Sequence, residues 1–136
     1  MGQTHVPVVS VEQEQALGPM VIVCEHASNH IPPEWGGLGL MADERRSHIA
    51  WDPGALGLAR GLARRLSAPL VHANVSRLVY DLNRPPHAPG AMAAKTEVYR
   101  IPGNENLSPE VRLSRTEAVY LPFHDALRAL IARRCA

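Results

Sequence analysis

Polar side chains that could perform acid–base or metal chemistry follow directly after an apolar run early in the chain. Residues 20–24 are apolar, and Glu25, His26 and His30 come next in the segment Cys-Glu-His-Ala-Ser-Asn-His-Ile-Pro. Such a run predicts a buried strand. Open α/β sheets place their chemistry where the chain leaves the carboxyl end of a strand. We therefore expect a functional site at this corner, with loop-anchoring hydrogen bonds as the structural alternative.

The spacing of His26 and His30 is that of a metal pair on a helix, but the local sequence argues against a helix. Pro32 and Pro33 follow closely, and Ala27 stands where the zincin motif has its glutamate. The pair alone therefore predicts no helical metal site.

A second histidine–carboxylate pair, His48 and Asp52, has the four-residue spacing that places two side chains on one helix face. Such a pair suits metal binding or acid–base chemistry. Asp52 also precedes Pro53, and a residue there is a good cap for the following helix. Both interpretations of Asp52 stay open.

The segment Ser-Arg-Leu-Val-Tyr-Asp-Leu-Asn-Arg-Pro (76–85) concentrates charge beside a predicted strand. On an extended chain Arg77, Asp81 and Asn83 share one face. Arg77 and Asp81 could form a simple ion pair. Alternatively, Arg77 or Arg84 could clamp a substrate carboxylate, because the guanidinium fork matches carboxylate geometry.

The remaining candidate is His124, which follows Pro122 on a predicted long helix. It is either structural or turned inward by a kink at the proline. The sequence has no Gly-x-Ser-x-Gly elbow, phosphate loop, dinucleotide fingerprint or Cys-x-x-Cys motif. Metal-assisted hydrolysis therefore fits this set of His, Glu and Asp residues best.

The elements that must position these groups form an α/β pattern. We predict strands at 20–24 and 70–73 and a further extended stretch at 75–82. Helices are predicted at 43–51 and 53–66, and a long helix at 109–133 begins at a Ser108 cap and kinks near Pro122. Residues 1–17 form a lead-in, and 18–136 form one domain. The expected sheet is mixed or mostly parallel, flanked by helices, and thin enough to suggest a partial domain.

The amino-acid composition limits the classes of binding partner that we expect. The 136 residues are 46% hydrophobic and 20% charged with a net charge of +1, so no strong attraction to nucleic acid or an anionic membrane is expected. The aromatic content of 4% is too low for a base-stacking platform. No signal peptide or membrane span is visible. Cys24 and Cys135 form no disulfide framework, which fits the cytoplasm, and the sequence leaves the oligomeric state open.

Five segments in order resemble the N-formylglutamate amidohydrolase family over about residues 20–130. They are Cys-Glu-His-Ala-Ser-Asn-His-Ile-Pro (24–32), His-Ile-Ala-Trp-Asp-Pro-Gly-Ala (48–55), segment 76–85, Ile-Pro-Gly-Asn (101–104) and Tyr-Leu-Pro-Phe-His (120–124). The resemblance implies a Zn²⁺-dependent enzyme that cleaves N-formyl-L-glutamate, or a related N-formyl or N-acyl amino acid, in histidine degradation. It also implies a fold similar to the zinc carboxypeptidases and phosphorylase/hydrolase-like proteins.

The resemblance also suggests residue roles. It implies Glu25 and His26 as catalytic residues. The implied metal ligands lie among Glu25, His26, His48, Asp52 and His124. Segment 76–85 would hold the substrate carboxylates through Arg77, Asn83 and Arg84. A bound Zn²⁺ would lower the pKa of its water to roughly 7.

Members of the family normally continue further, with another strand and a His-Ser-Phe-Thr-Pro-like segment that is absent up to Ala136. We therefore expect a truncated domain whose metal site lacks a ligand. The competing hypothesis is a catalytically incomplete remnant that binds a small molecule or a partner. A third is an amidase for another acylated substrate, because the Cys-Glu-His-Ala-Ser-Asn motif is typical of a less characterised branch.

Overall fold

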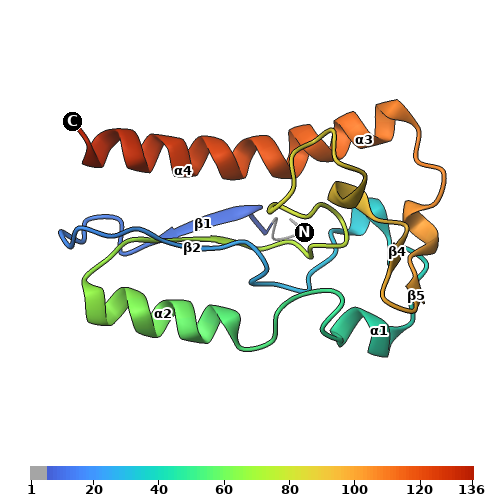
Figure 1. Cartoon of the computed structure of the whole chain (residues 1–136), viewed down its shortest axis with the longest axis horizontal. Coiled ribbons are helices and arrows are strands. Elements are labelled where there is room, and N and C mark those ends of the chain that lie inside the picture. The colour runs from blue at the N-terminus through green and yellow to red at the C-terminus, as the bar shows by residue number, and fades with distance from the viewer. Residues whose placement is uncertain (1–5) are drawn as a thin grey trace, which may run out of the picture.

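A mixed three-stranded sheet organises the chain, as the computed structural model of residues 6–136 shows (Figure 1). Its strands are β1 (Val9–Glu12), β2 (Ile22–Cys24) and β3 (Leu70–Ala73), in the order β1-β3-β2. Strand β2 runs parallel to β3, and β1 runs antiparallel to it. The α/β class and the mixed sheet flanked by helices are confirmed. Residues 1–5 of the predicted lead-in lie outside the described residues.

Strand β3 is the centre of the sheet, and all four of its residues are buried. It pairs on both sides, which explains why Leu70, Val71 and Ala73 are apolar. Strand β1 was not predicted, because Val-Ser-Val-Glu is a short alternation within a polar segment. Pairing with β3, from Val9 opposite Ala73 to Glu12 opposite Leu70, makes it a strand.

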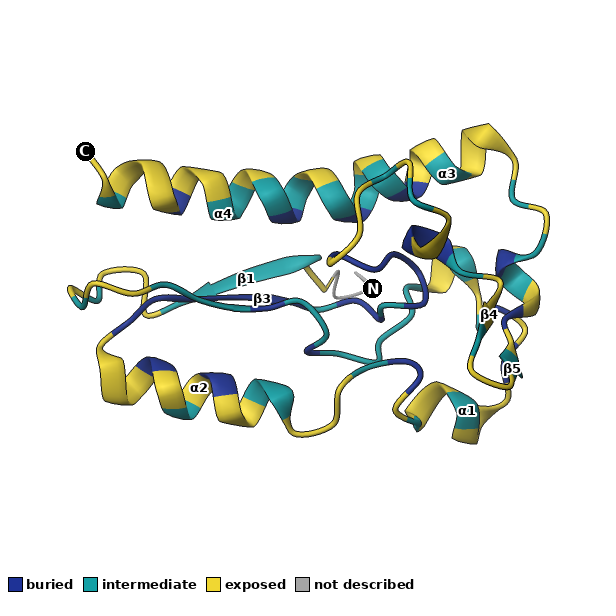
Figure 2. Cartoon of the chain, viewed as in Figure 1, coloured by how far each residue is buried: buried dark blue, intermediate teal, exposed yellow. Residues whose placement is uncertain are grey.

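Helices cover both faces of the sheet. Helix α2 (Ala55–Leu66) packs on β2 and β3, and helix α4 (Leu121–Arg134) packs on β1 and β3. The two helices lie on opposite sides of the sheet (Figure 1), and their buried residues face it (Figure 2). None of the helices within residues 6–136 combines the length and apolar character needed to cross a membrane.

The start of α2 corrects the expected cap. Gly54, not Asp52, is the N-cap residue, and its φ of 86° is in the left-handed region that favours glycine. The Asp52 side chain is instead bonded to Arg77 and His26. Asp52 therefore belongs to a side-chain cluster and not to the helix end.

Helix α1 (Ala42–Arg46) is shorter than the predicted 43–51. It ends at Arg46, and the C-cap residue Ser47 has an extended backbone and a hydroxyl that donates to the Glu44 carbonyl oxygen at 2.8 Å. This side-chain bond uses a carbonyl that would otherwise serve the continuing helix. His48 and Asp52 therefore do not share a helix.

The long C-terminal helix is confirmed, with one difference at the proline. Helix α3 (Pro109–Arg115) begins at Ser108, whose Oγ accepts a hydrogen bond from the Val111 N–H at 3.2 Å. A π-helical turn (Thr116–Tyr120) then leads into α4, and the Leu121 N–H donates to the Thr116 carbonyl. This wider turn stands where a kink near Pro122 was expected.

The stretch 75–82 is not extended, contrary to the sequence-based expectation. It turns repeatedly: the Val79 N–H donates to the Ser76 carbonyl at 3.1 Å, and the Arg84 N–H donates to the Asp81 carbonyl at 2.9 Å. The predicted alternation of side chains over two faces therefore does not hold. Arg77 and Asp81 meet instead across a turn.

Short elements build the end of the molecule next to this stretch. Strands β4 (Lys95–Thr96) and β5 (Tyr99–Arg100) form a hairpin. Single 3₁₀ turns lie at Pro33–Trp35, Pro89–Met92 and Pro102–Asn104. The core between the sheet and α4 extends under these turns; its largest fully buried apolar side chains are Tyr80, Phe123, Leu70, Met92, Ile101 and Leu130.

Candidate active site

Three chain segments meet at the carboxyl ends of the parallel strands β2 and β3. His26 follows β2 by two residues, and Arg77 and Asp81 lie on the turns after β3. The segment 47–54 lies between them. Its Asp52 N–H donates to the His26 carbonyl at 3.0 Å, and its Ala50 carbonyl accepts from the Arg77 N–H at 3.2 Å. Backbone bonds thus fix all three segments at the edge where α/β sheets place ligands.

His26 lies between two carboxylates. Its Nε2 is 2.7 Å from Asp81 Oδ1, and its Nδ1 is 3.3 Å from Asp52 Oδ2. The ring is only 13% exposed. The hydrogen bond to Asp81 raises the pKa of His26, although burial acts in the opposite direction. This environment favours an imidazolium that can donate a proton from either nitrogen.

Asp81 is the buried partner of that histidine, with a side chain 12% exposed. Burial by itself raises the pKa of a carboxyl group, but the hydrogen bonds from His26 and the Asn83 N–H outweigh it and lower the pKa of Asp81. The Asn83 N–H lies 3.0 Å from Asp81 Oδ1. Asp81 is therefore a carboxylate that holds the imidazole in place.

Arg77 completes the group of four charges that we call the His26 cluster: His26, Asp52, Arg77 and Asp81. Arg77 Nη1 lies 2.8 Å from Asp52 Oδ1, and Nη2 lies 3.8 Å from Asp81 Oδ2. Two carboxylates thus face one guanidinium and one imidazole that can carry a charge. Arg77 was predicted as a carboxylate clamp for substrate, and its guanidinium already contacts two carboxylates of the protein.

A pocket of about 170 Å³ adjoins the cluster through Arg77 and Asp81. Two further cations, Arg84 and Lys95, line it together with Thr96. Neither cation forms an ion pair with any residue from 6 to 136. Lys95 and Thr96 were not found from the sequence, because segment 91–103 has no clear pattern and only the β4–β5 hairpin brings them to the pocket.

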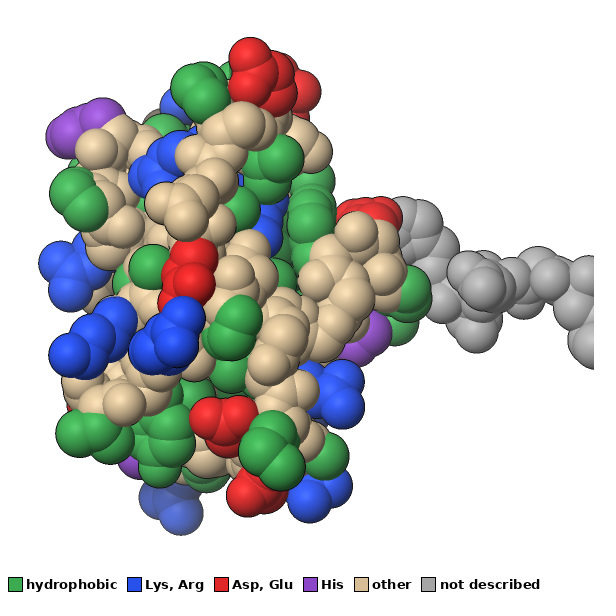
Figure 3. Space-filling view, turned by 90° about the vertical axis from the view of Figure 1, so that its right-hand side faces the viewer, with side chains coloured by type: hydrophobic (Ala, Val, Ile, Leu, Met, Phe, Trp, Pro, Cys, Tyr) green, Lys and Arg blue, Asp and Glu red, His purple; other side chains and the backbone are tan. Residues whose placement is uncertain are grey.

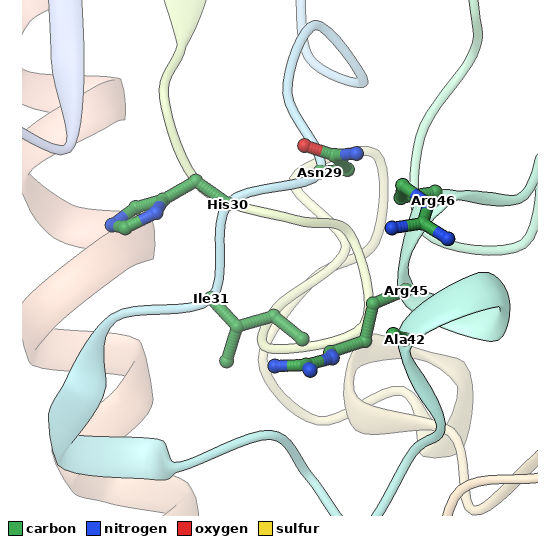
Figure 4. Close-up of a pocket in the computed structure, with 6 residues that line it drawn as sticks. All are labelled: Asn29, His30, Ile31, Ala42, Arg45 and Arg46. Atoms are coloured by element: carbon green, nitrogen blue, oxygen red, sulfur yellow. The ribbon is translucent and has the colours of Figure 1, made fainter.

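A second pocket, of about 300 Å³, lies between the loop after β2 and helix α1. Asn29, Arg45 and Arg46 line it, and Figure 4 shows the Asn29 amide facing Arg46 while the His30 ring turns away from Asn29 and both arginines. The end of the molecule with α1 and the hairpin shows basic, acidic and apolar side chains intermixed (Figure 3). No single charge dominates that face.

The other predicted site residues do not join the His26 cluster. Glu25 is partly exposed, and its carboxylate makes no hydrogen bond or ion pair within the described chain. His48 pairs with Glu97 at 3.1 Å, and both side chains are more than half exposed. The ring of His124 packs 4.2 Å from that of Tyr120, and its buried Nε2 has no partner among residues 6–136.

These placements do not fit a complete metal site. Within residues 6–136, no three His, Cys, Asp or Glu side chains are arranged to hold a metal ion. Both nitrogens of His26 face carboxylates, and Arg77 occupies the position of positive charge between Asp52 and Asp81. The donor types suit zinc, but their present arrangement is that of an ion-pair network.

The comparisons with known proteins identify the family. The family model for N-formylglutamate amidohydrolase matches residues 18–136. The crystal structure of gene product Atu2144 from Agrobacterium tumefaciens is 52% identical and superposes with a TM-score of 0.93, covering 95% of this chain and 51% of that one. The chain thus spans about half the length of that solved relative. No match was found among the curated proteins. The chain belongs to the N-formylglutamate amidohydrolase family.

Proposed function

We propose that this chain binds an N-formyl amino acid, with N-formyl-L-glutamate as the leading substrate, and contributes the acid–base residues that hydrolyse its formyl amide. The observation that carries the proposal is the 2.7 Å bond between His26 and Asp81 beside a pocket lined by two cations that pair with no carboxylate of residues 6–136. A proton donor thus adjoins a recess suited to a carboxylate. Membership of an amidohydrolase family supports the same reaction class.

Hydrolysis of a formyl amide requires a base for water and an acid for the departing nitrogen. The water oxygen bonds to the formyl carbon, the C–N bond breaks, and formate and an amine leave. We assign the acid to His26, which passes its proton to the amine nitrogen while Asp81 keeps the ring oriented. Glu25 has no bonded partner in the described chain and is the candidate base that accepts the proton of water.

Recognition of the amino acid falls to the pocket. Arg84 and Lys95 offer positive charge that no carboxylate of residues 6–136 neutralises, and the Thr96 hydroxyl adds a hydrogen-bonding group. An N-formyl dicarboxylic amino acid carries two negative charges, so two cations in one recess favour it over a neutral analogue. We therefore assign the clamp to Arg84 and Lys95, and assign Arg77 to holding Asp52 and Asp81.

A zinc requirement remains part of the proposal. When bound, Zn²⁺ would supply a more acidic water and polarise the formyl oxygen. The described residues do not form its site unaided, so we assign no step to it here. Metal analysis of the purified protein, before and after incubation with Zn²⁺, tests this part of the proposal separately: stoichiometric zinc supports it, and absence of bound zinc after incubation contradicts it.

The substrate assignment is tested by measuring formate release and binding with a panel of N-formyl and N-acetyl amino acids. We expect N-formyl-L-glutamate to bind most tightly, and R84S/K95Q to lose about tenfold or more in affinity, because a hydrogen bond to a charged group contributes about 1.5–3 kcal/mol. R65Q, an exposed change on α2, is the matched control. Binding without formate release in the presence of Zn²⁺ would instead support the binding-module hypothesis. Equal binding of neutral and acidic substrates would contradict the assignment.

A further inference from the structure

The segment Ile-Pro-Gly-Asn (101–104) contains a buried asparagine that the proposed chemistry does not use. Asn104 is 4% exposed. Its two amide N–H groups donate to the Leu78 carbonyl at 2.8 Å and the Ala93 carbonyl at 2.9 Å. Its Oδ1 accepts from Arg115 Nη1 at 2.6 Å. Both donors and the acceptor of this side chain are therefore engaged.

The two carbonyls that Asn104 binds belong to two different walls of the 170 Å³ pocket. Leu78 and Ala93 both line it. Leu78 lies on the turn that carries Arg77 and Asp81, and Ala93 lies two residues before Lys95. The amide of Asn104 thus joins the wall that carries Arg77 and Asp81 to the wall that carries Lys95.

Arg115, at the end of α3, reinforces this link from the core. It is 2% exposed, and besides Asn104 it donates to the Val79 carbonyl at 3.2 Å and the Gly103 carbonyl at 3.3 Å. No carboxylate of residues 6–136 pairs with it, and burial lowers the pKa of Arg115. A buried cation without a counterion is costly. Its charge-assisted bonds go to the backbone beside the pocket-lining Leu78 and to the turn that carries Asn104.

The position of Asn104 is itself fixed by close packing. The Gly103 N–H donates to the Leu38 carbonyl at 2.7 Å. A Cβ at position 103 would lie 2.6 Å from Leu38 Cα, so only glycine fits there. The 3₁₀ turn that carries Asn104 thus packs against Leu38 on one side and is bonded to Arg115 on the other.

We propose that Asn104 and Arg115 are positioning residues of the candidate site, which hold the Arg77–Asp81 turn and the Lys95 strand at the separation that a ligand must span. The inference rests on the proposed function for its ligand, but the geometry of the link does not depend on any activity. Neither residue lines the pocket, so both act through the walls that they bind.

The test uses Asn104→Asp, which preserves size and the acceptor for Arg115 but deletes both N–H donors to the pocket walls. Asn74→Asp is the matched control, because Asn74 also bridges two acceptors, Pro7 O and Ser10 Oγ, away from the pocket. Hydrogen exchange of 78–81 and 91–96 should accelerate about tenfold or more in N104D, with β3 unchanged, as expected when bonds of about 1 kcal/mol each are lost. N74D should leave those segments unchanged.

Two further measurements test the link between Asn104, Arg115 and the pocket walls. Arg115→Lys retains the charge but lacks the fork, and we expect it to accelerate exchange in the same segments. The affinity for N-formyl-L-glutamate should fall by about tenfold in N104D. If the wild-type chain binds no N-formyl amino acid, the proposed function fails, while exchange still tests the link. Unchanged exchange in folded N104D, or acceleration spread equally over β3, would overturn the inference.

Discussion

Two clusters in this molecule have nearly the same chemical composition and different surroundings. The His26 cluster contains a histidine, two carboxylates and an arginine. The second, which we call the Glu12 cluster, contains Glu12, Arg60 and His72: His72 Nε2 lies 2.8 Å from Glu12 Oε2, and Arg60 Nη2 lies 2.7 Å from the same oxygen. His72 is in the middle of the central strand β3, with a side chain 4% exposed. Arg60 reaches the sheet from α2.

The difference lies in what each cluster borders. The His26 cluster is at the strand ends, on turns, and two of its members line a pocket. The Glu12 cluster joins β1, β3 and α2 on the face of the sheet, and none of its residues lines either pocket. A histidine–carboxylate pair therefore indicates chemistry only where a ligand can reach it. In the body of the sheet the same pair satisfies a buried ring and ties a helix to a strand.

Removing the two histidines should separate these roles, and His26 should show the larger effect on chemistry. We expect His26→Asn to lower the rate of formate release by about 10²–10⁴-fold, because a positioned general acid contributes that much. His72→Asn should leave the rate per folded molecule unchanged. Steady-state formate assays on protein of verified fold measure both. Equal losses in the two variants would remove the distinction between the clusters.

Removing a carboxylate from each cluster should lower the free energy of unfolding more in the Glu12 cluster than in the His26 cluster. Glu12→Leu leaves the buried Nε2 of His72 without its partner, and we expect a loss of about 1–3 kcal/mol in the free energy of unfolding. Asp52 is 52% exposed, so Asp52→Leu should cost only about 0–1 kcal/mol. Urea denaturation compares the two. A larger stability loss at Asp52 would contradict the assignment of a structural role to the Glu12 cluster.

The two clusters should also respond to pH in opposite directions. The bond from Arg60, assisted by His72, lowers the pKa of Glu12 from 4.5 to about 2 although burial opposes it. This contribution is present above pH 4.5 and is lost as the pH falls toward 2. The pKa of His26 is raised, so its contribution is present below its ordinary pKa and is lost as the pH rises through its folded-state pKa.

Unfolding curves of metal-free protein across the pH range check this expectation. Glu12→Gln should flatten the acidic side of the stability profile, and His26→Gln should flatten the side above about pH 6.5, the ordinary histidine pKa. If Glu12→Gln flattened the basic side of the stability profile, or His26→Gln the acidic side, the assigned directions of the two pKa shifts would be wrong.

Substitution of the arginine in each cluster, Arg60 or Arg77, should give the smallest effects. Arg60 is 45% exposed, and we expect Arg60→Gln to cost about 0–1 kcal/mol. The charge of Arg77 lowers the pKa of His26, so Arg77→Gln should raise that pKa further. NMR titration of the imidazole protons measures the shift, and R60Q, which removes the arginine of the other cluster, is its control. A downward shift in R77Q would contradict the described charge arrangement.

The sequence predicted the strands and helices better than it predicted which side chains contact one another. Strand 70–73 and the helix that follows Ser108 were both predicted, because continuous apolar runs, caps and helical spacing are local signals. The four-residue spacing of His48 and Asp52 was misleading. The helix ends at Arg46, before either residue, so Asp52 contacts His26 and Arg77, whereas His48 pairs with Glu97.

What the sequence could not predict depends on contacts between distant segments. His26 and Asp81 are 55 residues apart, and only the parallel pairing of β2 and β3 brings the ends of their strands together. The role of His72 in an apolar strand was not predictable, since its partner Glu12 lies on a strand that itself forms only by pairing. Lys95 reaches the pocket through a two-residue hairpin strand that has no pattern of its own.

We propose that the His26 cluster contacts the ligand and supplies the acid for hydrolysis. The most direct test is NMR of the imidazole groups during titration with N-formyl-L-glutamate. We predict that the signals of His26 shift in a saturable manner while those of His72 remain in place. The measurement reports ligand binding alone, so it does not require the chain to hydrolyse the substrate. A shift at His72 without one at His26, or saturable binding that leaves His26 unperturbed, would contradict the account.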